Sequence, residues 1–141
     1  MTRINADYEL KKLTDQHVMA EYRELPMVIA ALKRSLRTQP TNTVLKKIPN
    51  SFTLNKGHVT FFYNKLTFLS KRYDRLIIEL KERGYKLDAD RKLDFNDIPD
   101  VFFNDWHAKE KDNIIIENRI SEKIQMKPHW YRYYGKPISH N

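Results

Sequence analysis

Apolar residues recur at helical spacing in three separate segments of the chain. In residues 15–37 they alternate at intervals of four and three: Val18, Tyr22, Leu25, Ile29, Leu32 and Leu36. This spacing forms one stripe of an α-helix, and Thr14 or Asp15 can cap its start. The pattern therefore predicts one long amphipathic helix in this segment.

Two further helices follow from the same spacing. In residues 60–83 the stripe consists of Phe62, Leu66, Leu69, Tyr73, Leu76 and Leu80. Gly84 comes directly after a basic run and is a typical helix stop. A shorter helix is predicted over residues 111–125, with isoleucines at positions 116, 120 and 124 and a proline beyond its end. Residues 93–102 are expected to hold one helical turn.

The chain lacks a β pattern, because no useful length of it alternates apolar and polar residues. We therefore predict an all-α fold, a compact three-helix bundle with long irregular connectors at residues 38–58 and 85–109. No repeat or linker-like composition divides the 141 residues, so residues 1–141 are expected to form a single domain. The aromatic end from residue 127 onward is expected to pack across the bundle.

The charge balance adds a partner to this picture. Lys and Arg total 26 against 18 acidic residues, a net charge of +8, which favours nucleic acid ahead of a membrane through counterion release. A merely basic soluble protein is the alternative. The absence of cysteine excludes disulfides, thiolate nucleophiles and cysteine-bound metals, and it favours the cytoplasm. We expect no membrane span or signal peptide, since no apolar run approaches the ~18 residues of a span.

Candidate chemistry lies on the first helix, away from its apolar stripe. The residues opposite the stripe are Gln16, Arg23, Met27 and Arg34. His17 and Glu24 are two turns apart and share a flank. Pro26 removes a backbone hydrogen bond and is expected to bend the turn beside Glu24. The alternative, which helix geometry alone favours, is that Arg23 and Glu24 are ordinary solvated charges.

The first residues offer a second candidate, because initiator methionine is commonly removed before a small residue such as Thr2. The α-amine exposed in this way has a reference pKa of about 7.7–8.0, against about 10.4 for lysine. A neutral fraction therefore exists that can act as a Schiff-base nucleophile. Many proteins begin with Met-Thr without such a role.

The stretch KPHWYRYYGK, residues 127–136, interleaves rings with cations. The rings are Trp130, Tyr131, Tyr133 and Tyr134, and the cations are Lys127, Arg132 and Lys136. Such rings can stack on bases while the cations contact phosphates. Arg119, Lys123 and Lys127 also form a row that could follow a phosphate backbone. Alternatively, the rings cover the core and the charges only solvate it. The histidines lack ligand spacing, so neither a metal site nor a cofactor is expected.

Four segments together resemble the viral pyrimidine-dimer DNA glycosylase/AP lyases of the endonuclease V type. They are MTRIN, DQHVMAEYRELP, GHVTFFYNKLTFLSKR and WYRYYGKPI, which follow the order of the family over nearly the whole chain. The resemblance implies that the N-terminal segment passes between the helices to reach the active site. It implies a monomeric, cofactor-free repair enzyme in the cytoplasm, that of the host cell for a viral enzyme. Its partner would be double-stranded DNA with pyrimidine dimers or abasic sites.

The resemblance also assigns roles. In the family, the amine of the mature N-terminal threonine attacks C1′ of the dimer's 5′ nucleotide and leaves an imine, and β-elimination then cuts the strand. The nucleophile maps to Thr2 and the essential carboxylate to Glu24, which can stabilise the cationic transition state and take the C2′ proton. Positions around the nucleophile and damaged strand map to Arg3, Gln16, His17 and Arg23. Phosphate-gripping positions map to Arg119 and Lys123.

The chain departs from the family pattern at two places. Met27 stands where an arginine is expected, and one extra residue lies between Asn5 and Asp15. Both departures bear on DNA affinity and lesion range rather than on the proposed nucleophile or acid. Two alternatives therefore stay open: a non-catalytic protein of the same fold that binds damaged DNA, and a glycosylase or AP lyase that prefers another lesion.

Overall fold

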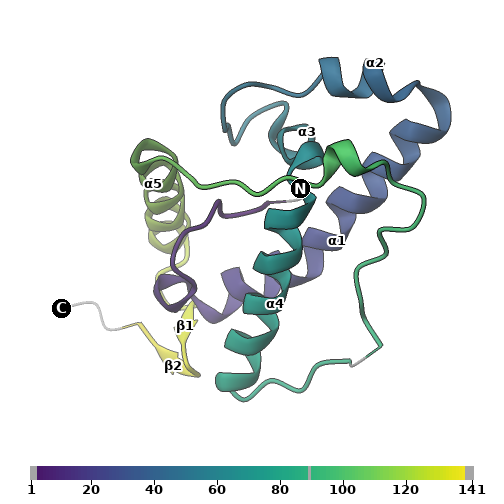
Figure 1. Ribbon diagram of the computed structural model, residues 1–141. Helices are drawn as coiled ribbons and strands as arrows, with labels where there is room; N and C mark the ends of the chain where they lie inside the picture. Colours follow the sequence, from purple (N-terminus) through teal and green to yellow (C-terminus); the bar gives the residue numbers. More distant parts are fainter. Residues whose placement is uncertain (1–2, 89, 139–141) are drawn as a thin grey trace.

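The computed structural model describes residues 3–88 and 90–138, and it confirms the all-α fold class (Figure 1). The helices are η1 (Leu10–Lys12), α1 (Asp15–Thr38), α2 (Thr41–Lys46), α3 (His58–Phe61), η2 (Phe62–Asn64), α4 (Leu66–Glu82), η3 (Asp100–Phe102) and α5 (Glu110–Met126). A short hairpin follows, formed by the two-residue strands β1 (Arg132–Tyr133) and β2 (Lys136–Pro137). Within the described ranges, no helix is long and apolar enough to cross a membrane.

Helix α1 matches the prediction for residues 15–37 and extends it by one residue. The Thr14 side chain accepts the backbone N–H of His17, so Thr14 is the cap. Five of the six stripe residues are buried as expected, with Val18 and Leu25 fully inaccessible, and Leu36 near the end of the helix is partly buried. The helix continues through Pro26 to Thr38, so the proline does not end it.

The second predicted helix requires a correction. Instead of one helix over residues 60–83, the chain forms α3 and the adjoining η2, and then α4. The break lies between η2 and α4, at Lys65, whose backbone leaves the helical region (φ −128°, ψ 40°). The Lys65 ammonium donates to the Phe61 carbonyl and to Asn64 Oδ1, both at 2.8 Å, and so partners a carbonyl at the end of α3. Phe62 and Leu66 stay buried across the break, which is why the apolar spacing does not reveal it.

The other helix boundaries agree with those predicted from the sequence, and the structure adds one short helix, α2. α4 ends before Gly84, which adopts a positive φ of 93°. η3 lies at the end of the predicted turn in residues 93–102, and α5 matches residues 111–125 closely. The connector 38–58 is less irregular than predicted, because it contains α2.

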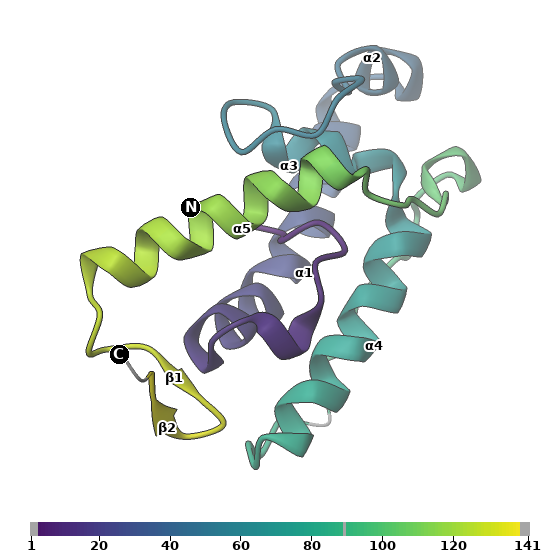
Figure 2. The ribbon, with the colours of Figure 1, turned by 90° about the vertical axis from the view of Figure 1, so that its left-hand side faces the viewer.

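The N-terminal segment lies inside the helical framework. α1 and α4 form the most extensive helix pair, and α5 lies to one side of them. Residues 3–9 run between α5 and the α1–α4 pair (Figure 2). Ile4 and Ala6 are fully buried there. The path expected from the family resemblance is therefore present in residues 3–9, and it brings Ile4 and Asn5 against α1, α3 and α5.

Candidate active site and nucleic-acid interface

Two side chains from different helices bind the backbone of the N-terminal segment. The Ile4 N–H donates to Nε2 of His58 at 2.9 Å. The other ring nitrogen, Nδ1, lies 2.7 Å from the Thr53 carbonyl. Since Nε2 accepts, Nδ1 carries the proton and donates to Thr53. Burial lowers the pKa of His58 to about 4, so the ring is neutral in ordinary buffers.

The next residue is held by a buried ion pair. Asn5 donates its backbone N–H and its side-chain amide to Glu21 Oε1, at 3.1 and 2.8 Å. Arg72 binds the same carboxylate through Nε at 2.6 Å and Nη2 at 3.0 Å, and its Nη1 donates to the Tyr8 carbonyl at 2.8 Å. The Glu21 and Arg72 side chains are 0% and 2% exposed. A buried charge needs such partners, so this pair connects α1, α4 and the N-terminal segment.

Sequence reasoning missed Glu21 and Arg72. The available signal was their position: each lies three residues after a stripe residue, Val18 or Leu69, at the edge of the buried face. Opposite charges at such positions on two helices are compatible with a buried pair. They are equally compatible with two solvated charges at the edge of a stripe.

Glu24 lies one turn after Glu21 on α1, beside Arg3, the first residue that the structure describes. Its side chain is half-buried, and this burial raises the pKa of its carboxyl, although a hydrogen bond from the Arg3 backbone and the nearby Arg119 act in the opposite direction. Thr2, the predicted nucleophile, lies outside the described residues. The structure thus brings Glu24, Arg3 and Arg119 together at the point where the described chain begins.

Arg119 joins α5 to this group. Its Nη1 is 3.3 Å from Asn5 Oδ1. Burial is the main cause that lowers the pKa of the Arg119 guanidinium, and the neighbouring Arg3 lowers it further. Two cations and one carboxylate therefore share a partly desolvated region, a suitable place for a phosphate or a developing charge. Arg23, on the other side of Glu24 in sequence, is exposed.

Gln16 and His17 contact the C-terminal tail. Gln16 Nε2 donates to the Trp130 carbonyl at 2.7 Å, and its Oε1 accepts the Arg132 N–H at 3.1 Å. The buried His17 ring stacks on Tyr131 with centroids 4.8 Å apart and planes 8° apart. Burial lowers the pKa of His17 to about 4, so the ring carries no charge for a phosphate at neutral pH. Both residues attach the tail to α1, and their roles in DNA binding stay predictions.

The rings of the tail, for which the sequence allowed either core packing or base stacking, differ in exposure. Tyr131 is buried, whereas Trp130 is 54% exposed and makes an edge contact with it. Lys127 Nζ lies 5.3 Å from the centre of the Trp130 ring. Lys123, Lys127 and Arg132 are all exposed. One ring therefore completes the packing while another, beside a cation, faces solvent.

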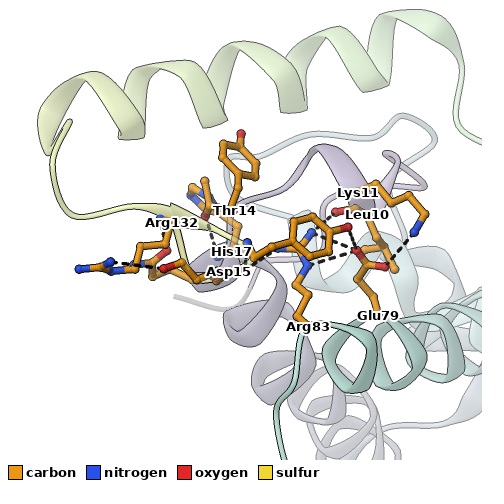
Figure 3. A network of polar contacts seen from close by, with 12 residues as sticks. Leu10, Lys11, Thr14, Asp15, His17, Glu79, Arg83 and Arg132 are labelled. Atoms are coloured by element: carbon orange, nitrogen blue, oxygen red, sulfur yellow. Dashed lines mark hydrogen bonds and ion pairs between the residues drawn. The ribbon is translucent and has the colours of Figure 1, made fainter. Parts of the chain in front are cut away.

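A second buried polar network holds the hairpin (Figure 3). Asp15 accepts Arg83 Nη1 at 2.9 Å, and the backbone N–H groups of Tyr134 and Gly135 at 3.0 and 2.9 Å. Arg83 also contacts Glu79 at 3.1 Å and donates to the Leu10 carbonyl at 2.9 Å. The Tyr134 hydroxyl donates to Glu79 at 2.6 Å. The hairpin is thus attached where α1 begins and α4 ends.

A comparison with known families places these features in context. Residues 1–93, about two thirds of the 141-residue chain, match the family model described as pyrimidine dimer DNA glycosylase. The matched span contains Glu21, Glu24, His58 and Arg72, whereas α5 and the hairpin follow it. Among residues 3–88 and 90–138, no group of three or more His, Asp and Glu side chains could hold a metal ion.

Proposed function

Because the chain belongs to the pyrimidine dimer DNA glycosylase family, we propose that it acts through its own N-terminal amine. The substrate of the family is DNA that contains pyrimidine dimers. In the proposed reaction, the α-amine of Thr2, freed by loss of Met1, attacks C1′ of the 5′ nucleotide of a cyclobutane dimer. The C1′–N bond to the base breaks, the displaced base takes a proton and stays joined to the 3′ pyrimidine through the cyclobutane ring, and opening of the sugar ring gives an imine.

The second half of the proposed reaction is an AP lyase step. Glu24 takes the proton from C2′, the C3′–O bond breaks, and the 3′ phosphate leaves with its electron pair. Water then hydrolyses the imine and frees the amine. Before this step the Glu24 carboxylate stabilises the positive charge that develops at C1′. Its partial burial strengthens that interaction, because less water competes for the charge.

The observation that supports this proposal most is the way the chain after Thr2 is held beside Glu24: Asn5 donates to Glu21, one turn before Glu24 on the same helix, and the Arg3 backbone acts on the Glu24 carboxyl. Arg3 is the residue directly after Thr2, and consecutive Cα atoms are only about 3.8 Å apart. Ile4 and Asn5 are fixed behind it by His58 and Glu21. An amine presented one residue before Arg3 would therefore start close to the carboxylate.

The proposed DNA interface surrounds this point. Arg3 and Arg119 would contact the damaged strand, and Arg23, Lys123, Lys127 and Arg132 would contact phosphates farther out. Trp130 would stack on a base, as exposed rings do beside cations. Gln16, His17 and Tyr131 would act by holding the tail. We propose that a monomer binds both dimer-containing and abasic duplexes.

Borohydride trapping tests the mechanism, because it reduces an imine to a stable adduct. Wild-type protein without Met1 should trap on duplexes with one dimer or one abasic site. Retention of Met1 should remove the adduct on both duplexes. Glu24→Gln should remove it on the dimer duplex, where the glycosidic bond must break first, whereas the abasic duplex should still form the imine but should not be cut. Glu122→Gln, which replaces an exposed acid on α5, should trap and cut normally. No adduct with wild-type protein on either duplex would refute the imine mechanism.

Lys65 supplies a discriminating variant. Burial lowers the pKa of its ammonium to about 8, so this side-chain amine has an accessible neutral form and is a second candidate nucleophile. Its Nζ is already bonded to Phe61 and Asn64 at the start of α4. Lys65→Arg should therefore leave trapping unchanged, and loss of the adduct would identify Lys65 as the nucleophile.

Lesion preference needs a separate comparison of substrates. Faster cleavage of an oxidised-purine duplex than of a dimer duplex would indicate a different lesion preference.

A further inference from the structure

The contacts of residues 4 and 5 define the register of the N-terminal segment, that is, which backbone N–H meets which acceptor. An extended backbone offers one N–H group per residue, and a shift by one residue would present each N–H to the wrong acceptor. Here Ile4 donates to His58 on α3, and Asn5 donates to Glu21 on α1. Both acceptors are buried, at 2% and 1% exposure, so an N–H that lost its acceptor could not turn to water instead.

We propose that His58 is a positioning residue that sets the register of the N-terminal segment and hence the place of the amine beside Glu24. It works together with Glu21, which fixes the following residue. This role rests on the proposed function for the amine, but it concerns residues that do not touch the reacting atoms. His58 and Ile4 are 54 positions apart, so the contact joins the chain start to α3 rather than to its own neighbours.

The ring of His58 is suited to this role because both nitrogens are used in a fixed sense. Nδ1–H donates to the Thr53 carbonyl at 2.7 Å, which orients the ring and leaves Nε2 as the acceptor. The ring is also enclosed by Phe52 and Phe62, with centroids 5.6 and 5.4 Å away. A neutral, oriented ring cannot rotate to release the N–H of Ile4 without losing its own bond to Thr53.

Glu21 is fixed just as firmly. Arg72 binds both of its carboxylate oxygens, so the acceptor for Asn5 has a defined position. Asn5 uses its side-chain amide on the same oxygen, and its own Oδ1 lies 3.3 Å from Arg119. Errors of about 1 Å in the position of a reacting group can cost about a hundredfold in rate. Residues that fix the segment two and three positions after the amine therefore matter for the chemistry.

Two substitutions at one position separate positioning from general stability. His58→Gln places an amide oxygen near the position of Nε2 and can still accept from Ile4. His58→Asn reaches only as far as Nδ1, so it can keep the Thr53 contact but not the Ile4 contact. Val44→Ala is the matched control, since Val44 is buried on α2 and contributes packing alone.

The measurements are the single-turnover rate of glycosidic bond cleavage at saturating dimer duplex, the dissociation constant of the same duplex, and the melting temperature. His58→Asn should lower the rate at least tenfold and change the dissociation constant less than threefold. His58→Gln should restore the rate to within threefold of wild type, and Val44→Ala should lower only the melting temperature. An equal rate for the Asn and Gln variants, or a rate that follows melting temperature across all three, would overturn the proposal.

A measurement on the wild-type protein covers the case in which His58→Asn does not fold. Ring ¹⁵N shifts should report a neutral His58 with its proton on Nδ1, and the Ile4 N–H should exchange slowly with solvent. A proton on Nε2 would overturn the proposal, because that nitrogen could not then accept. Borohydride trapping separately tests the nucleophile: failure of wild-type trapping refutes the amine mechanism, whereas the rate of glycosidic bond cleavage by the His58 variants reports on the register.

Discussion

Asp15 is predicted to hold the C-terminal hairpin on the bundle. Its carboxylate accepts Arg83 and the backbone N–H groups of Tyr134 and Gly135, and the Asp15 and Arg83 side chains are 4% and 0% exposed. Asp15→Asn keeps the shape of the side chain but removes its charge. It also turns one acceptor into a donor that faces an N–H group or the Arg83 guanidinium.

The contacts that Asp15 loses and those that Arg83 keeps determine the size of the effect. Breaking a buried ion pair costs about 3–5 kcal/mol when the remaining charge has no other partner. Arg83 keeps Glu79 and the Leu10 carbonyl, so a lower cost of about 2 kcal/mol is appropriate here. The hairpin N–H groups can turn to water, which adds about 1 kcal/mol. We therefore expect a loss of about 3 kcal/mol in the free energy of unfolding, or a factor of about 100 in the folding equilibrium constant.

Urea denaturation followed by circular dichroism measures this loss, and trypsin cleavage after Arg132 reports release of the hairpin. Glu82→Gln is the control, because Glu82 is 54% exposed and its ion pair with Lys11 at 3.5 Å is a surface pair worth about 0–1 kcal/mol. If Asp15→Asn costs no more than Glu82→Gln, and trypsin cleaves both variants at the same rate, then the buried network does not hold the hairpin.

Four further predictions concern charge and pH. Lys123→Ala should weaken binding to damaged and undamaged duplexes equally and lower the salt slope by about one, whereas a loss confined to damaged DNA would place Lys123 in lesion recognition. Burial lowers the pKa values of His17 and His58 from 6.5 to about 4, so the unfolded chain takes up their protons first. Folding stability should therefore fall between pH 6.5 and 4, by up to about 3 kcal/mol per ring, and urea titrations of His58→Gln should show a shallower fall. Because burial raises the pKa of Glu24, the acid limb of glycosidic bond cleavage should lie above pH 4.5, and a limb at or below that value would show that burial does not raise the pKa of a catalytic Glu24. The same shift means that ionised Glu24 opposes folding, so Glu24→Gln should melt higher than wild type at pH 7, as calorimetry would show.

Local patterns in the sequence determined most of the helices. The spacing of apolar residues in α1 and α5 is a property of neighbouring positions, so it needs no knowledge of the fold. The Thr14 cap and the Gly84 stop are local in the same way. Local reasoning also marked Glu24 and the aromatic tail as candidate chemistry. It could not rank them above ordinary solvated charges and rings, which obey the same spacing.

The break at Lys65 shows where local reasoning ends. The apolar stripe continues through it, yet the Asn64 carbonyl turns to accept the side chain of Asn104, 40 positions away, at 2.8 Å. The bond from Phe68 to the Asn104 carbonyl fixes the start of α4 in the same way. A helix can be interrupted where its backbone N–H and carbonyl groups form hydrogen bonds with residues distant in sequence. The spacing of apolar side chains does not show which distant residues these are.

The candidate site depended on tertiary structure for the same reason. The sequence supplied an amine, a carboxylate and several cations, but Glu21 and Arg72 are 51 positions apart, and His58 and Ile4 are 54 apart. A charged or polar residue at the edge of a helix stripe looks the same in sequence whether it is solvated or buried. Only the packing of α1, α3, α4 and α5 around the first residues decided which of these groups lost water, and so which had to find a partner in the N-terminal segment.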